Sequence, residues 1–356
     1  MIELSITPSI VKQHKDWIFG ENAQDDDRLY KKLNFLVDNE VVPDIKNVFK
    51  FIFDNLSSII SGDLESLDSI INRYEAIMKD FRNTDLKEKS KVRGRNIYQG
   101  AKERKLIKQL KEVFVNEYEY FYSSKNWNAY IFLKELGVSI CPYCNSQFLF
   151  LYNEKGRKTR ATLDHFFDKA TYPFLAISIY NLVPSCKVCN SDLKSTKLFH
   201  LGKNYSPYER NIVENMRFKI DVTSVKKSSK LINEYSEIDY YEMFIGNSTE
   251  FKIDIEINTE DEMKKLKIKG NLEVFRIVDL YNKYHKNYVK SLIRKSHIYN
   301  KVYLYSLMNT FESIFLNEED LYNAIYPKIT DDKNYMLAKL SREIAKQQLE
   351  FLNSHN

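Results

Sequence analysis

The sequence is poor in glycine and proline, which number 9 and 7 among its 356 residues. Both mark turns and loops, so their scarcity disfavours a loop-rich all-β protein and favours long helices. Long apolar runs are also missing, since stretches such as residues 148–152 fall far short of the roughly 20 residues that span a membrane. The chain does not open with a basic segment followed by an apolar run, as a signal peptide would. We therefore expect a soluble cytoplasmic protein without a membrane partner.

Cysteine is equally rare, and all 4 cysteines fall into two Cys-x-x-Cys pairs, Cys141/Cys144 and Cys186/Cys189. In a reducing compartment such pairs are metal ligands more often than disulfides. Four thiolates suit the tetrahedral coordination of Zn²⁺. We expect one structural zinc ion, and two buried or redox-active pairs are the alternative.

The remaining composition is that of an ordinary globular protein, with 43% hydrophobic and 29% charged residues. A net charge of +5 permits a nucleic-acid partner without requiring one. The length allows two or three domains.

The first part of the chain, residues 1–138, reads as a helical N-terminal domain. Apolar residues recur at three- and four-residue spacing over residues 29–60, with a break at Pro43, and again over 64–81. The charged run 87–105 is interpreted as a solvated linker or a basic surface. One helix is expected over residues 106–136, with Gly137 as its C-cap.

Residues 206–356 form a C-terminal domain of two strands followed by helices. Alternating apolar residues predict strands at 218–222 and 251–257. An aromatic-rich periodic run from Leu272 to Tyr284 predicts the opening of one long helix. The fold class is thus α+β, with mostly helical flanks around the cysteine-bracketed segment.

That segment, residues 139–205, carries the chemistry. Apolar runs at 148–152 and 159–164 flank the turn signal Asn153-Glu154-Lys155-Gly156, which predicts a hairpin whose returning strand ends on Asp164 and His165. A short extended piece at 182–184 follows. A helix is expected from Cys189, with Asn190 or Ser191 as its cap and with Asn190 and Lys194 on one face.

At these residues the segment resembles the HNH endonucleases, whose ββα-metal module carries Asp-His at a strand end, an Asn after a loop, and His or Asn on a helix. Asp164-His165, Asn181 and Asn190 occupy those positions, and a four-cysteine zinc site is a frequent addition in that family. The phrases CPYC and NLVPSCKVCN resemble nucleases of bacterial anti-phage systems of the Septu and retron-linked types. Asn190 in place of His and Asp168 in DHFFDK depart from the commoner pattern.

The residue types suit phosphodiester hydrolysis. His165 can take a proton from water. Oxygens of Asp164 and Asn190 suit a catalytic Mg²⁺ or Mn²⁺ better than Zn²⁺ or Ni²⁺. The resemblance implies that Asn181 fixes the orientation of the histidine.

Other residues of the segment have two interpretations. Lys194, Arg157, Lys158 and Arg160 could contact phosphates or be solvated surface charges. His200 follows the helix and is expected in a surface loop. Seven aromatic residues are expected in the core rather than as stacking platforms for bases: Tyr143, Phe148, Phe150, Phe166, Phe167, Tyr172 and Phe174.

The sequence therefore predicts a metal-dependent HNH endonuclease acting on nucleic acid, with DNA favoured over RNA, in anti-phage defence beside a partner such as an ATPase. The alternative is a non-catalytic, zinc-stabilised module that binds nucleic acid or a protein.

Overall fold

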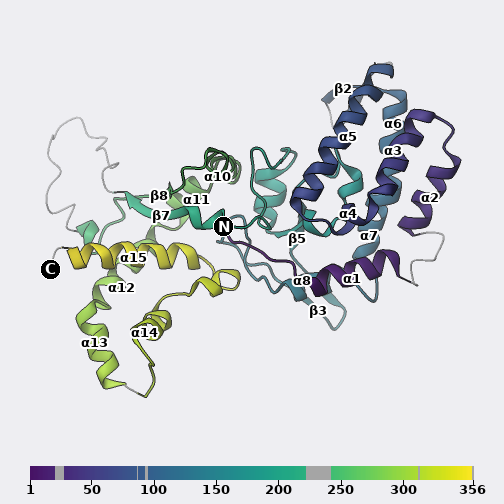
Figure 1. Cartoon of the computed structure of the whole chain (residues 1–356). Helices are drawn as coiled ribbons and strands as arrows, with labels where there is room; N and C mark the ends of the chain where they lie inside the picture. The colour runs from purple at the N-terminus through teal and green to yellow at the C-terminus, as the bar shows by residue number, and fades with distance from the viewer. Residues whose placement is uncertain (21–27, 86, 93–94, 222–241, 312, 355–356) are drawn as a thin grey trace, which may run out of the picture.

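The computed structural model describes residues 1–20, 28–85, 87–92, 95–221, 242–311 and 313–354, and its helices and short strands make an α+β protein (Figure 1). In the described residues the strands form four separate two-stranded antiparallel sheets. No described helix has both the length and the apolar character needed to cross a bilayer. The predicted fold class is confirmed at this level.

Helices of the first part of the chain gather at one end of the molecule (Figure 1). Pro43 starts a helix at its first position, where its missing N–H costs nothing, and so separates two helices as predicted. The helices are α1 (Pro8–Phe19), α2 (Leu29–Asn39), α3 (Pro43–Asp54), α4 (Leu56–Ser61), α5 (Leu64–Thr84), α6 (Ala101–Leu110), α7 (Asn116–Phe121) and α8 (Ala129–Leu136).

The charged run is not an irregular linker, because its backbone forms the hairpin β1 (Lys87–Val92) and β2 (Arg95–Gly100) and then enters α6; its alternative role as a basic surface stays a prediction. The prediction of a single helix over residues 106–136 is wrong. α6, the π-helical turn η2 (Lys111–Val115) and α7 follow one another without a break, and residues 122–128 separate them from α8. Asn128 caps α8, and Gly137 ends it in the left-handed conformation (φ 63°), as expected of a C-cap.

The opposite end of the molecule holds the two predicted strands, β7 (Met216–Asp221) and β8 (Lys252–Ile257), which pair with each other; Val222 lies outside the described residues. The expected long helix is interrupted at Arg276, which has a positive φ, and again at His285. The helices are α10 (Glu262–Phe275), α11 (Ile277–Tyr284), α12 (Lys286–Ile298), α13 (Lys301–Thr310), α14 (Glu318–Ile325) and α15 (Ala338–Ser354).

Between these two ends lies the cysteine-bracketed segment (Figure 1). The hairpin is shorter than predicted, with β3 (Tyr152–Glu154) and β4 (Arg157–Thr159) joined at Lys155 and Gly156, both with positive φ. The returning strand is split, because β5 (Thr162–His165) pairs instead with β6 (Leu182–Ser185). A short helix, η5 (Val188–Lys194), follows β6.

The core is built from all three parts of the chain. Of the seven aromatic residues predicted to be internal, Tyr143, Phe166, Phe167 and Phe174 are buried and Tyr172 is half-buried. The prediction is wrong for two of them: Phe148 and Phe150 are exposed.

Candidate metal centre and adjoining histidine

The four cysteines meet in one buried cluster, as the sequence predicted. Their Sγ atoms all lie within 4.8 Å of one another. In a tetrahedral ZnS₄ site with bonds of about 2.3 Å, the sulfurs are about 3.8 Å apart. The cluster can therefore hold a metal ion such as zinc.

Backbone groups around the cluster are arranged to stabilise thiolates. The N–H of Cys186 points at Cys141 Sγ and the N–H of Cys189 at Cys186 Sγ, each at 3.4 Å. Burial raises the pKa of the Cys141 thiol well above its usual value, since a thiolate without a counter-ion is poorly solvated there. A bound cation would supply the missing charge compensation.

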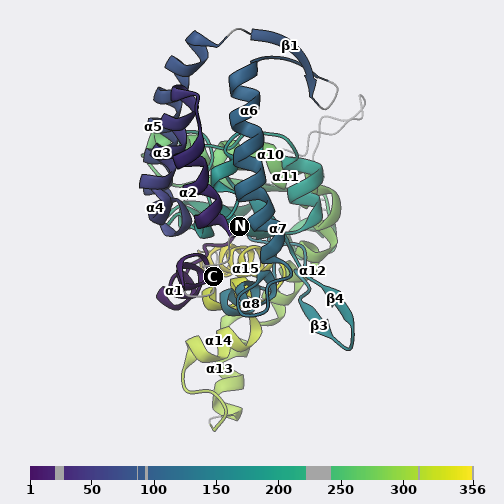
Figure 2. The same ribbon diagram turned by 90° about the vertical axis from the view of Figure 1, so that its right-hand side faces the viewer.

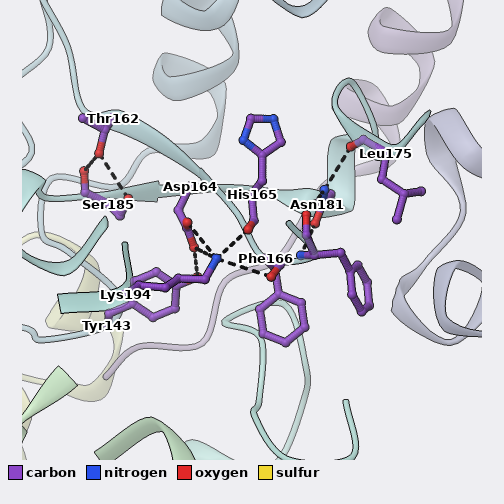
Figure 3. A network of polar contacts seen from close by, with 10 residues as sticks. Tyr143, Thr162, Asp164, His165, Phe166, Leu175, Asn181, Ser185 and Lys194 are labelled. Atoms are coloured by element: carbon purple, nitrogen blue, oxygen red, sulfur yellow. Dashed lines mark hydrogen bonds and ion pairs between the residues drawn. The ribbon is translucent and has the colours of Figure 1, made fainter. Parts of the chain in front are cut away.

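Asp164 and His165 are consecutive on β5, so their side chains leave opposite faces of the strand (Figure 3). Asp164 points toward η5, whereas the ring of His165 points away from it. The sequence predicted that both side chains gather around one cation, but in the structure they point to opposite sides of β5.

Asp164 is held in a buried ion pair with Lys194. The Lys194 Nζ lies 2.8 Å from both carboxylate oxygens, and the Tyr143 hydroxyl donates to Oδ2 at 2.7 Å. The ammonium also donates to the carbonyls of His165 (2.5 Å) and Phe166 (3.3 Å). Only 4–5% of either side chain is exposed. Neither a cation at Asp164 nor a phosphate at Lys194 fits this arrangement unless the ion pair opens.

His165 is held by one ring nitrogen. Nε2 lies 2.9 Å from the Ala176 carbonyl, and because a carbonyl only accepts, Nε2 carries the proton and leaves Nδ1 as a base in the neutral ring. The ring packs edge-on against Tyr118, with centroids 4.6 Å apart. Burial, with the positive charges of Lys169 and Lys194, lowers the pKa of His165 to about 3. The imidazole is therefore neutral at pH 7.

Asn181 clamps the loop between β5 and β6. Its Oδ1 accepts from the Phe167 N–H at 2.7 Å, while Nδ2 donates to the carbonyls of Phe167 (3.0 Å) and Leu175 (2.9 Å) (Figure 3). Leu175 precedes Ala176, whose carbonyl receives the His165 proton. The amide thus fixes the backbone that orients the histidine.

Asn190 lies inside η5 rather than at its cap, because the helix begins at Val188. Its N–H donates to the Cys186 carbonyl (3.0 Å) and its carbonyl accepts from Ser195 (2.9 Å). Within the described residues its side-chain amide forms no hydrogen bond with Asp164 or His165. Its predicted role as a metal ligand stays a prediction.

The basic residues divide into two groups. Arg157 and Lys158 are exposed on β4, whereas Arg160 is half-buried with its guanidinium carbon 3.8 Å from the centre of the Tyr122 ring. The Tyr122 hydroxyl bonds to that of Tyr118, which contacts His165. Of the three arginine and lysine residues Arg157, Lys158 and Arg160, it is therefore Arg160 that is linked to the histidine, through Tyr122 and Tyr118.

Three residues near the histidine were missed from sequence: Tyr118, Tyr122 and Lys169. The Lys169 Nζ lies 4.5 Å from the centre of the Tyr118 ring. The spacing of the two tyrosines indicated a shared helix face, but no local signal places that face against His165.

Compared with models of protein families, with curated proteins and with solved structures, the chain matches none of them.

Proposed function

We propose that the protein is an endonuclease of the HNH type that hydrolyses phosphodiester bonds of nucleic acid, with DNA as the favoured substrate. The observation that carries the proposal is the fixed orientation and position of His165. Its ring is neutral, its Nε2–H is fixed on Ala176, and it stands at the end of β5 in a strand–loop–strand–helix unit joined to a four-cysteine cluster. The lone pair on Nδ1 of this neutral ring would accept the proton from water, and because burial and the charges of Lys169 and Lys194 lower the pKa of the ring to about 3, the proposal requires the negative charge of a bound phosphate to raise that pKa.

The residues around it would act in support. Asn181 holds the loop that fixes the ring, so it is a positioning residue. Arg160 places a positive charge at the end of the hairpin, against the Tyr122 ring, and Tyr122 and Tyr118 lie between this charge and the histidine. A Mg²⁺ or Mn²⁺ ion would neutralise charge on the phosphate, but Asp164 offers its oxygens only after Lys194 withdraws. A role in anti-phage defence beside an ATPase rests on the sequence resemblance alone.

The second candidate is a non-catalytic, zinc-stabilised binding module. The ion pair between Asp164 and Lys194 favours it. Both carboxylate oxygens of Asp164 already accept hydrogen bonds from Lys194, which indicates a structural role rather than an open metal ligand.

Cleavage assays separate the two functions. Wild type and His165→Ala are incubated with plasmid DNA and total RNA, in Mn²⁺ or in chelator, and metal content is measured on the same samples. We expect about one zinc per chain in both proteins and fragments only with wild type. Because removal of the base typically costs 10²–10⁴-fold, His165→Ala should look inactive.

His200→Ala is the matched control, because this histidine is exposed in the loop after η5. It should cleave like wild type. Equal behaviour of wild type and His165→Ala would favour the binding module.

A further inference from the structure

The hairpin β3–β4 is an arm that projects from the molecule (Figure 2). All six residues of its two strands are exposed on both faces. A two-stranded hairpin alone is marginally stable in water and buries little here. The side chains of both strands are therefore accessible to a ligand.

Charge on this arm is concentrated and of one sign. Residues 151–160 contain four Lys or Arg residues and one Glu, a net charge of +3, in a chain whose total is +5. Such a local concentration attracts a polyanion.

Beside the charge lies an aromatic platform formed by Phe148 and Phe150. Their rings stack on each other with centroids 5.9 Å apart and an angle of 25° between planes. Phe148 is 49% exposed and Phe150 70%, whereas Leu149 between them is buried. Alternation along the chain therefore directs both rings to solvent and anchors the segment by Leu149.

The combination of stacked aromatic faces and adjoining cations is the chemistry that binds unpaired bases and their phosphates. A duplex keeps its base faces stacked inside the helix and would use the cations alone. We infer that the arm binds a single-stranded segment of nucleic acid, with bases on Phe148 and Phe150 and phosphates on Arg157 and Lys158. The inference rests on the proposed nuclease function for the class of substrate and adds its strandedness.

The arm also has a physical connection to the histidine. Arg160 directly follows β4, and its contact with Tyr122 leads through Tyr118 to His165. The foot of the arm is thus joined to the proposed base by direct side-chain contacts.

Binding is measured by fluorescence anisotropy with labelled 20-mers of dT and rU and with a 20-base-pair DNA duplex, on the zinc-loaded full chain without added Mg²⁺ or Mn²⁺. The variants are Phe148→Ala/Phe150→Ala and Arg157→Ala/Lys158→Ala, with Phe35→Ala as control because Phe35 is an exposed phenylalanine on α2. Thermal unfolding confirms that each variant is folded.

We expect wild type and Phe35→Ala to prefer both single strands over the duplex. The double phenylalanine variant should lose about tenfold or more on single strands and nothing on the duplex. The double basic variant should lose affinity on both and show a salt dependence shallower by about 1–2 in log K against log salt.

Three results would overturn the inference: duplex preference by wild type, no measurable binding of the dT or rU 20-mers, or unchanged single-strand binding by the phenylalanine variant. A phenylalanine-dependent dimer without oligonucleotide binding would assign the platform to self-association. Because these assays contain no added Mg²⁺ or Mn²⁺ and record no cleavage, their outcome can be interpreted even if the nuclease test fails, and the nuclease test can be interpreted even if they fail.

Discussion

At the scale of single residues, the buried ion pair between Asp164 and Lys194 decides what β5 can do. A desolvated pair is costly to break from one side, because the remaining charge has no compensation. The same charge, once freed, is a potential cation ligand. Asp164 therefore has a structural role while the ion pair is closed, and it could bind a metal ion only when the pair is open.

Lys194→Met should destabilise the protein by about 3–5 kcal/mol, since it leaves the Asp164 carboxylate buried without its partner. In Asp164→Asn/Lys194→Met part of this loss should be recovered. Urea unfolding with and without Mn²⁺ measures both effects. Stabilisation by Mn²⁺ in the single variant and not in the double one would show that Asp164 can bind a cation. If Lys194→Met is as stable as wild type, the Asp164 carboxylate does not depend on Lys194 for charge compensation.

A second buried residue, His14, makes acid stability testable. Its Nε2–H donates to the Ile177 carbonyl (2.8 Å), and its Nδ1 accepts from the Trp127 indole (3.0 Å). Burial lowers the pKa of His14 to about 4. The unfolded chain, with a histidine pKa of 6.5, binds the proton first, so stability is complete above that value and falls as the pH drops toward 4.

His14→Gln removes the titrating ring, and its loss of unfolding free energy between pH 7 and pH 5.5 should be smaller than that of wild type by about 1 kcal/mol. Urea unfolding at the two pH values measures the difference, and effects of pH on the cysteine cluster cancel because both proteins contain it. Identical losses in the two proteins would mean that His14 is not held neutral.

At the scale of elements, residue spacing and single helix-ending residues predicted several helix boundaries and the cysteine cluster correctly. The two Cys-x-x-Cys pairs placed four thiolates together, Pro43 separated α2 from α3, and Gly137 capped α8. The effects of Pro43 and Gly137 depend on chemistry within a few residues of the position, whereas the two cysteine pairs, far apart in the sequence, were placed together by the preference of one zinc ion for four thiolates. Alternation similarly identified β7 and β8, because the apolar face of β7 is buried and the apolar residues of β8 are buried or half-buried against the core.

Other features were not predicted, because they depend on packing between parts of the chain that are distant in sequence. The helix after Leu272 breaks at Arg276 and His285, where neither glycine nor proline marks the site. Phe148 and Phe150 have the alternating pattern of a half-buried strand, but both side chains are exposed. The partner of Asp164 was unpredictable because it lies 30 residues away, on a helix whose direction is set by the cysteine cluster.

At the scale of the whole molecule, the cysteine-bracketed segment is enclosed by distant parts of the chain. The Ile2 N–H donates to the Pro142 carbonyl, and the Ser139 and Ile140 N–H groups donate to the carbonyl of Lys333. The Tyr281 hydroxyl donates to the Cys144 carbonyl at 2.6 Å. The division of the chain into domains at residues 139–205 stays a prediction, and a separate domain with these bounds would lose all of these hydrogen bonds.

A fragment comprising residues 139–205 should therefore lack fixed tertiary structure even with zinc. Tyr143, which donates to Asp164, stacks on Phe275 at 4.4 Å between centroids, and that ring is absent from the fragment. Below about 70–80 residues a single core rarely supplies enough stability on its own, so the metal would hold a loosely packed chain. Near-ultraviolet circular dichroism and limited proteolysis, with the zinc-loaded full chain as control, measure the difference. A protease-resistant fragment with a sharp thermal transition would instead establish the segment as an autonomous domain, to which the flanking helices are merely attached.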